Sequence, residues 1–306
     1  MHAGSGCRRG LRRRSGQTRP AAAAQRLHSG TLGVDATAAA GFAIPDGTPA
    51  GNTAMNAILV RLSGYTLLAW ATAQRWRNAR RPQVEQAWLR QINAVGIGAL
   101  PVASVLAVLL GAALVTQLTT LAGTDSDLVQ RILFLGLFFE LAPLLSALIV
   151  VSRSSASIAS ELAIMALHGE FIALRRLGVS PVDYLFLPRI LALAVALPII
   201  TLAFQVIAVG SGWLAVAGLQ KLALGEVAGR FLDLADPLLV LASLAKSALA
   251  GLLIGVIACY HGSHSERQGA RDAEAVSAAA LLAVGNGLIA VFAVDVAFAL
   301  LLWLLR

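Results

Sequence analysis

Charged residues are scarce in this 306-residue chain: they make up 13% of it, hydrophobic residues make up 58%, and the mean hydropathy is +0.76. Soluble domains carry about 25% charged and about 45–50% apolar residues. Half the usual charge cannot cover the surface of a water-soluble domain of this length. The composition therefore excludes a soluble enzyme and a soluble DNA-binding domain, and it indicates an integral membrane protein.

Cysteine is rare as well. Cys7 and Cys259 form neither a disulfide framework nor a Cys/His spacing suited to zinc. The only close pair of histidines, His261 and His264, is expected to be solvated in a loop at the end of a span. A phosphate-binding loop of the form G-x-x-x-x-G-K-[ST] is also missing. We therefore expect no metal site, no catalytic residue and no cofactor in this chain.

The positive charge is concentrated at the front of the chain. Residues 1–93 hold 13 arginines against three acidic residues, whereas the rest of the chain sums to −2. This excess precedes the first long apolar run, where the positive-inside rule places an orientation signal. We therefore expect a cytoplasmic N-terminus and no nucleic-acid partner.

Three regions follow from composition. Residues 1–53 read as a basic, disordered extension; the alternatives are an organelle transit sequence, which is also Arg-rich and acid-poor, and an upstream extension from a misassigned start before Met55. Residues 54–93 read as interfacial amphipathic helices, because basic residues flank the short apolar stretch 55–78 at both ends. A sixth crossing by 55–78 is the alternative. Residues 94–306 form the transmembrane domain.

Five long apolar runs predict transmembrane helices at residues 94–122, 132–152, 184–213, 237–260 and 275–305. Each run is long enough for a bilayer core, which takes about 20 helical residues. With the N-terminus inside, the loop at 153–189 faces the cytoplasm and the C-terminus lies outside. The predicted fold is an all-α membrane protein with an interfacial helix, five spans, and a cytoplasmic helix between the second and third.

Small residues recur every four positions in three of these runs. In lipid, helices associate through close backbone approach at such residues, so the pattern predicts a compact bundle. The three series are Ala99, Ala103, Ala107 and Gly111; Ser243, Ser247, Gly251, Gly255 and Cys259; and Ala275, Ala279, Ala283 and Gly287.

Residues 140–189 carry the most informative pattern. The segment begins as a span, turns polar at Ser152, continues with helix-forming residues to Leu177, and stops at Gly178 before Pro181 and Pro188. A helix terminator followed by prolines is a stop signal. A helix therefore emerges from the membrane here, runs along the cytoplasmic surface and returns as the third span, which suits a cytoplasmic partner.

The same segment has a recognisable order of residues: E-L-x-P, then R, E-L-x-x-M, A-L, G-x-x-P, Y-L and P-R. The matching positions are Glu140, Leu141, Pro143, Arg153, Glu161, Leu162, Met165, Ala173, Leu174, Gly178, Pro181, Tyr184, Leu185, Pro188 and Arg189. This order resembles the MlaE/YrbE family, the permease subunits of MCE-associated ABC transporters, which includes a chloroplast lipid-transport branch. The resemblance extends more weakly from about residue 90 to the C-terminus.

The sequence departs from the family pattern at a few places. Phe139 stands where the family has arginine, and Gly169 and Ile172 stand where it has acidic residues. RQGARDAEA (267–275) replaces a glycine-rich turn. These departures concern the contact with the ATPase.

The resemblance implies a homodimeric permease with a cytoplasmic ABC ATPase subunit, which carries ATP and Mg²⁺, and an MCE-domain substrate-binding protein on the outer side. The implied cargo is phospholipid or a similar amphiphile, and the implied location is a cell inner membrane, with a plastid envelope as the alternative. An ion-coupled secondary transporter remains the second hypothesis, although the two related halves it would need are not visible.

The resemblance places the ATPase-coupling helix around Glu170. The coupling candidates are Glu161, Met165, Glu170, Leu174 and Gly178. Glu161 and Met165 lie one helical turn apart, whereas nine residues separate Glu161 from Glu170. In a continuous helix this separation would turn the two carboxylates to opposite faces.

Candidates for the lipid pathway or the dimer interface are Glu140, Pro143, Arg153 and Lys246. A charge at the centre of a span costs roughly 2.5–3.5 kcal/mol on insertion scales. Glu140 is therefore either a functional polar group or a structural carboxylate paired with arginine or backbone. Lys246 and Asp295 are either structural polar groups or part of transport chemistry. Arg153 is a membrane anchor, an ion-pair partner or a headgroup ligand.

Overall fold

The computed structural model describes residues 53–75, 82–122, 135–220, 237–264 and 272–304, and every element in these ranges is helical. The extension predicted for residues 1–53 lies outside them, apart from Thr53. Residues 123–131 and 221–236, which the predicted orientation would place on the outer side, lie outside them too.

The first two helices are α2 (Thr53–Gln74) and α3 (Pro82–Ala122). A continuous helical stretch follows, made of η2 (Leu135–Leu141), α5 (Ala142–Val150), η3 (Val151–Ser155) and α6 (Ala156–Leu167). The short α7 (Glu170–Arg176) leads to η4 (Val182–Phe186), which continues into α8 (Leu187–Gln220). The last helices are α10 (Pro237–Ser263) and α11 (Asp272–Leu304). The η segments are π-helical turns, which often occur at functional sites.

Five spans are confirmed in the described part of the chain, and the protein is an all-α, multi-pass membrane protein. The helices long and apolar enough to cross a bilayer are Glu85–Gln117, Phe139–Leu167, Val182–Gly212, Pro237–Ser263 and Ala273–Leu301. α2 is not among them by length and composition. Its placement in the membrane interface stays a prediction.

The boundaries of the first two spans differ from those expected. Residues 82–93, expected to form a separate interfacial helix, are the first turns of α3. The second span, expected to end at residue 152, stays apolar and helical to Leu167. Two of the serines that made this segment look polar donate their hydroxyls to carbonyls of the same helix: Ser152 Oγ donates to Ile149 O at 3.0 Å, and Ser160 Oγ to Ala156 O at 2.7 Å.

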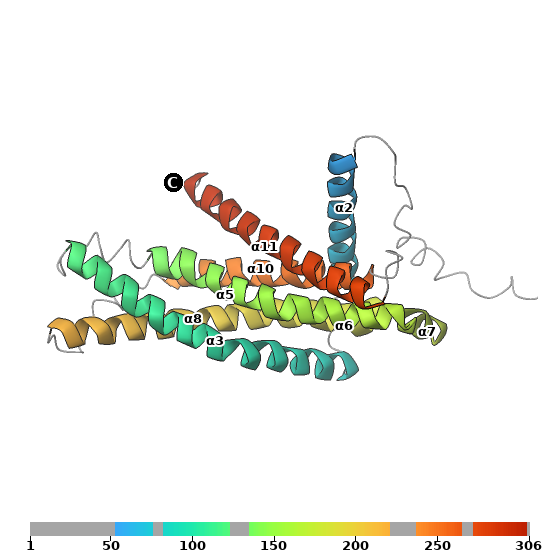
Figure 1. Cartoon of the computed structure of the whole chain (residues 1–306), viewed down its shortest axis with the longest axis horizontal. Helices are drawn as coiled ribbons and strands as arrows, with labels where there is room; N and C mark the ends of the chain where they lie inside the picture. Colours follow the sequence, from blue (N-terminus) through green and yellow to red (C-terminus); the bar gives the residue numbers. More distant parts are fainter. Residues whose placement is uncertain (1–52, 76–81, 123–134, 221–236, 265–271, 305–306) are drawn as a thin grey trace, which may run out of the picture. The chain divides into compact units, whose positions relative to one another are not determined.

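The helices pack as the small residues predict. α8 packs against α3 and α10, and α10 packs in turn against α6 and α11 (Figure 1). All members of the three predicted series are buried. The backbone contacts are close: a Cβ on Gly251 would collide with the backbone carbonyl of Leu193, and one on Gly262 would lie 2.6 Å from Leu162 Cβ. The prediction of a compact bundle is therefore confirmed.

Candidate coupling and transport sites

Two glycines shape the elbow that joins the second and third spans. α6 ends at Leu167, and Gly169 adopts a φ of 70°, so the helix breaks before α7. α7 ends in a Schellman motif at Gly178, whose φ is 75°: Gly178 N donates to Arg175 O and Val179 N to Leu174 O. The continuous helix expected up to Leu177 is therefore wrong, since glycine tolerates the left-handed conformation that interrupts it.

α7 is a surface helix. None of its residues is buried, and Glu170 and Ile172 are exposed beside Leu177, whose side chain is 76% exposed. A ring contact between Phe171 and Phe186, with centroids 6.0 Å apart, attaches α7 to the start of the third span. The helix therefore offers charged and apolar side chains together at one end of the bundle.

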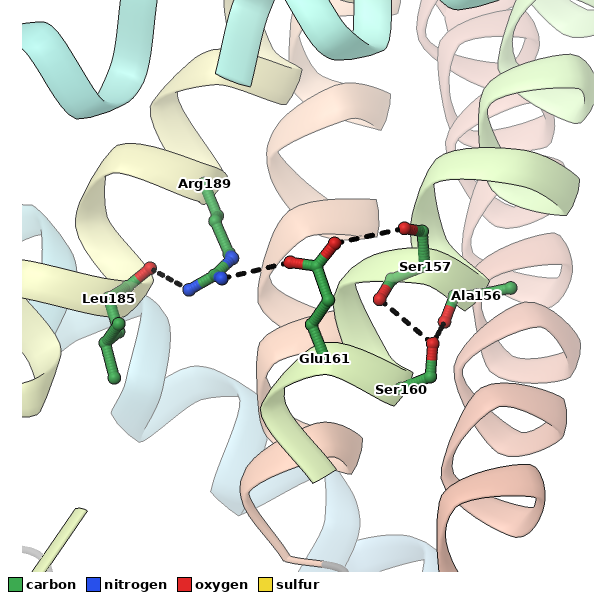
Figure 2. A network of polar contacts seen from close by, with 6 residues as sticks. All are labelled: Ala156, Ser157, Ser160, Glu161, Leu185 and Arg189. Atoms are coloured by element: carbon green, nitrogen blue, oxygen red, sulfur yellow. Dashed lines mark hydrogen bonds and ion pairs between the residues drawn. The ribbon is translucent and has the colours of Figure 1, made fainter. Parts of the chain in front are cut away.

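Glu161 lies on α6, before the break, and it joins two spans (Figure 2). Arg189 of α8 donates through Nη2 to Glu161 Oε2 at 3.1 Å, and through Nη1 to Leu185 O at 3.2 Å. Ser157 Oγ donates to the other carboxylate oxygen at 3.3 Å. Because the Glu161 side chain is half exposed, this pair orients the two helix ends rather than adding much stability.

The five coupling candidates thus fall into two groups. Glu170, Leu174 and Gly178 lie on α7 and its closing turn, whereas Glu161 and Met165 lie on α6. The half-turn relation between Glu161 and Glu170 does not apply, because Gly169 separates their helices.

A second contact ties α2 to the same elbow. Arg75, just after α2, donates through Nη1 to Ser180 Oγ at 2.6 Å and to Asp183 Oδ2 at 3.0 Å. The pair spans more than 100 residues of sequence, and no local pattern indicates it. The contact holds the C-terminal end of α2 against the turn that leads into the third span.

A cluster of three charged side chains lies well away from the elbow. Lys246 on α10 is 3% exposed, and its Nζ lies 2.9 Å from Glu140 Oε2 and 2.5 Å from Asp295 Oδ1. The Phe139 ring centroid lies 4.8 Å from the same nitrogen. Glu140 precedes Glu161 by 21 residues, or about 30 Å of helix at 1.5 Å per residue. The cluster therefore belongs to the end of the bundle opposite the elbow.

Pro143 removes one backbone donor beside this cluster. In an α-helix the carbonyl of Phe139 would accept a hydrogen bond from residue 143, but proline has no N–H. Lys246 Nζ donates to that carbonyl at 3.3 Å. Three of the four pathway candidates, Glu140, Pro143 and Lys246, thus form one site with Phe139 and Asp295.

Arg153, the fourth pathway candidate, lies elsewhere. It sits in the π-helical turn η3, is exposed, and donates from its guanidinium to the backbone carbonyl of Gly98 in α3. A Cβ on Gly98 would lie 2.6 Å from Arg153 Nη2, so a side chain there would displace the guanidinium from its present position. Arg153 joins the first and second spans.

The expectation that His261 is a solvated loop residue is wrong. It is buried in the last turn of α10. Asn286 Nδ2, which donates to Leu282 O at 2.8 Å, lies 3.1 Å from His261 Nε2. An amide nitrogen only donates, so Nε2 accepts, and the Tyr65 hydroxyl at 2.8 Å donates to the same atom. The imidazole is therefore neutral, with its proton on Nδ1.

The comparison with protein families decides the identity of the chain. The family model described as permease MlaE matches residues 88–301. This range includes all five spans, apart from the first three residues of the span Glu85–Gln117. The chain belongs to the MlaE permease family. It is therefore a transporter permease with several membrane spans.

Relatives of this MlaE permease have consistent names. A probable ABC transporter permease protein of Rickettsia typhi is 33% identical over 65% of this chain and 76% of its own. One of Synechocystis is 29% identical over 67% of this chain and 77% of its own. The chloroplastic protein trigalactosyldiacylglycerol 1 of Arabidopsis thaliana is 30% identical over 61% of this chain and about half of its own length, 51%.

Sequence reasoning missed how α2 attaches to the permease. Beside the bond to His261, the Tyr65 ring meets the Tyr260 ring edge-on with centroids 4.8 Å apart, and a Cβ on Gly64 would collide with Tyr260. Tyr65 was visible only as one of several aromatic residues along α2. The signal that could have found it is Gly64, a glycine inside a helical pattern that marks a close approach.

We expect Tyr65→Phe to change the alkaline titration of the protein. Burial, together with Tyr260 and opposed by Arg61, raises the pKa of Tyr65 from 10.0 to about 12. The neutral phenol is therefore favoured by folding, so its contribution to stability is complete below pH 10 and is lost as the pH rises through about 12. Ultraviolet absorbance of tyrosinate should show a late component at unusually high pH, and Tyr65→Phe should reduce its amplitude.

The exposed Tyr184 provides the matched control for this titration. Tyr184→Phe should leave the late component in place, since its hydroxyl is not part of the α2 contact. A late component of undiminished amplitude in Tyr65→Phe contradicts the assignment.

Proposed function

We propose that this chain is the permease subunit of an ABC transporter that moves phospholipids or similar amphiphiles between membranes. A separate cytoplasmic ATPase drives it. The observation that carries the proposal is the match of the permease family over five spans, combined with an exposed elbow helix between the second and third.

The ATPase would dock on α7. This helix has no buried residue and lies between two glycines that adopt the left-handed backbone conformation. It is attached to the third span through the contact between Phe171 and Phe186. A force applied to α7 would therefore reach α6 and α8, which Glu161 and Arg189 join. Named ABC permeases among the relatives support a partner of this kind and disfavour an ion-coupled transporter.

The exposed apolar side chains of the spans favour lipid as the cargo. The side chains exposed along α3 and α8 are mostly Leu, Val and Ile, which suit acyl chains. The plant relative is named after a galactolipid, which supports an amphiphilic cargo for this chain too. The charges of Lys246, Glu140 and Asp295, of which only Lys246 is buried, would lie on the pathway or beside a dimer axis at the outer end.

The assembly would contain two copies of this chain, the ATPase on the cytoplasmic side and an MCE-domain protein on the outer side. The arginine-rich front of the chain supports a cytoplasmic N-terminus and elbow. The bacterial relatives support a cell inner membrane, and the chloroplastic one leaves a plastid envelope as the alternative.

We expect Glu170→Lys to uncouple the complex. The substitution reverses an exposed charge in the first turn of α7, at the proposed ATPase contact, and places a cation at a helix N-terminus, where it is unfavourable. Lipid-stimulated ATP hydrolysis should fall roughly tenfold, the effect of disturbing a charge pair worth about 1.4 kcal/mol. The measurement is ATPase activity of the purified complex in vesicles.

Glu85→Lys is the matched control. Glu85 is exposed in the first turn of α3, so the same charge reversal is made at a helix N-terminus outside the elbow and outside residues 267–275. It should hydrolyse ATP as the wild type does, and the ATPase should co-purify with both. Normal lipid stimulation in Glu170→Lys, or a complex that never retains an ATPase, would remove the proposal.

A further inference from the structure

A hollow of about 450 Å³ opens between the first and third spans. It is lined by Gln86, Ala87 and Arg90 of α3 and by Tyr184 of η4. α3 and α8 pack along each other (Figure 1), and the hollow lies between the first turns of α3 and η4, which leads into α8. Neither the coupling site nor the charged cluster includes any of them.

The polar groups that line the hollow are rich in donors. The Arg90 guanidinium carries five N–H groups, and the Gln86 amide and the Tyr184 hydroxyl add further donors. None of the four lining residues is acidic. The nearest acids in sequence are Glu85 and Asp183, and Asp183 is bonded to Arg75 at 3.0 Å. The lining therefore suits an anion, and a phosphate with its several acceptor oxygens in particular.

The position of the hollow connects it to the membrane. The apolar span of α3 begins at Glu85 and the one that contains η4 begins at Val182, so the hollow lies where both helices enter the bilayer. Tyrosine and arginine are typical of this boundary. A free anion would meet the hollow from water, but a lipid phosphate already lies at this depth.

Apolar side chains continue along α3 from the hollow. Ile97 and Val108 follow Arg90 by seven and eighteen residues, which are close to whole helical turns, and both are exposed. On the neighbouring α8, Val195 and Leu202 are exposed as well. Acyl chains can thus lie against both helices while the phosphate stays at Arg90.

We propose that the hollow binds the phosphate group of an anionic membrane phospholipid. Arg90 and Tyr184 donate hydrogen bonds to its oxygens. A zwitterionic lipid is bound less well, because no lining carboxylate accepts its ammonium group. The orientation proposed above places this lipid in the cytoplasmic leaflet, whereas the binding itself does not depend on that orientation.

The test is lipid retention by the full-length chain in nanodiscs of phosphatidylcholine with a minority of phosphatidylglycerol. Native mass spectrometry after release should show phosphatidylglycerol enriched on the wild type. Arg90→Gln should lower this retention roughly tenfold, the effect of losing one charge-assisted hydrogen bond. Tyr184→Phe, which removes only a hydroxyl, should lower it by a smaller factor, and it keeps the test valid if Arg90→Gln fails to fold.

Arg175→Gln is the matched control, since it removes one exposed positive charge from α7 without touching the hollow. It should retain phosphatidylglycerol as the wild type does. Equal retention by Arg90→Gln, or an equal loss in Arg175→Gln, overturns the proposal. Displacement of the lipid by inorganic phosphate would assign the hollow to a free anion instead. Retention is measured without ATP, so failure here leaves the transport proposal intact.

Discussion

Replacing Lys246 with methionine is expected to remove most of the folded protein from the membrane. The substitution leaves Glu140 and Asp295 facing each other without a cation, and it leaves the Phe139 carbonyl without its donor. Breaking a buried ion pair by removing one partner costs about 3–5 kcal/mol, and the partial exposure of the Glu140 and Asp295 side chains, 40% and 21%, places this loss toward the lower end of that range. Native proteins are stable by about 5–15 kcal/mol in total, so this loss is a large fraction of the whole.

The expected result is measured as the amount of monodisperse protein after detergent extraction, together with its thermal unfolding. The matched variant combines Lys246→Met with Glu140→Gln and Asp295→Asn, which removes the stranded charges while keeping the shapes of the side chains. It should recover much of the lost stability. A single Lys246→Met that unfolds like the wild type would mean that the carboxylates are not held by the lysine.

The same combined variant separates the two roles that the sequence leaves open for these residues. If it folds and the complex still moves lipid, the three charges are structural. If it folds and transport stops, the charges act on the cargo, because their structural cost has been removed.

Much of the fold follows from the lipid bilayer that surrounds the chain. A bilayer demands long apolar helices, so the five runs could be predicted from composition alone. The small-residue series around Gly111, Gly251 and Gly287 were also visible, because lipid leaves close backbone approach as the main packing device. Serines such as Ser152 and Ser160 were harder to place, because a hydroxyl bonded to its own helix fits an apolar span although the residue type is polar.

The sites were less predictable because they depend on contacts between distant residues. Glu140, Lys246 and Asp295 each appear as a single charge in a separate span, and nothing in their spacing brings them together. The break at Gly169 was missed for a different reason: a glycine inside a helical pattern costs only about 1 kcal/mol, so the sequence does not say whether the helix continues. The coupling role of Glu170 stays a prediction that the exposure of α7 supports.

Alanine at Gly111 and alanine at Gly96 are expected to change stability in opposite directions, although both glycines lie in α3. A Cβ on Gly111 would collide with the carbonyl oxygen of Ala208 in α8, and it would lie 2.5 Å from Ser211 Oγ. Gly212 of α8 faces Gly111 in return, with a Cβ there 2.8 Å from the Gly111 carbonyl oxygen. Neither backbone can yield without separating the first and third spans.

Gly111→Ala should therefore lose about 1–3 kcal/mol or more, the cost of overpacking a close contact. Gly96 has no atom within 4 Å of its Cβ position, so Gly96→Ala should gain about 0.5–1 kcal/mol from helix propensity. Thermal unfolding in one detergent measures both. Equal shifts of the unfolding temperature in the two variants would mean that glycine matters in α3 only through the flexibility of the helix. Shifts in opposite directions would mean that α3 packs on α8 because Gly111 has no side chain.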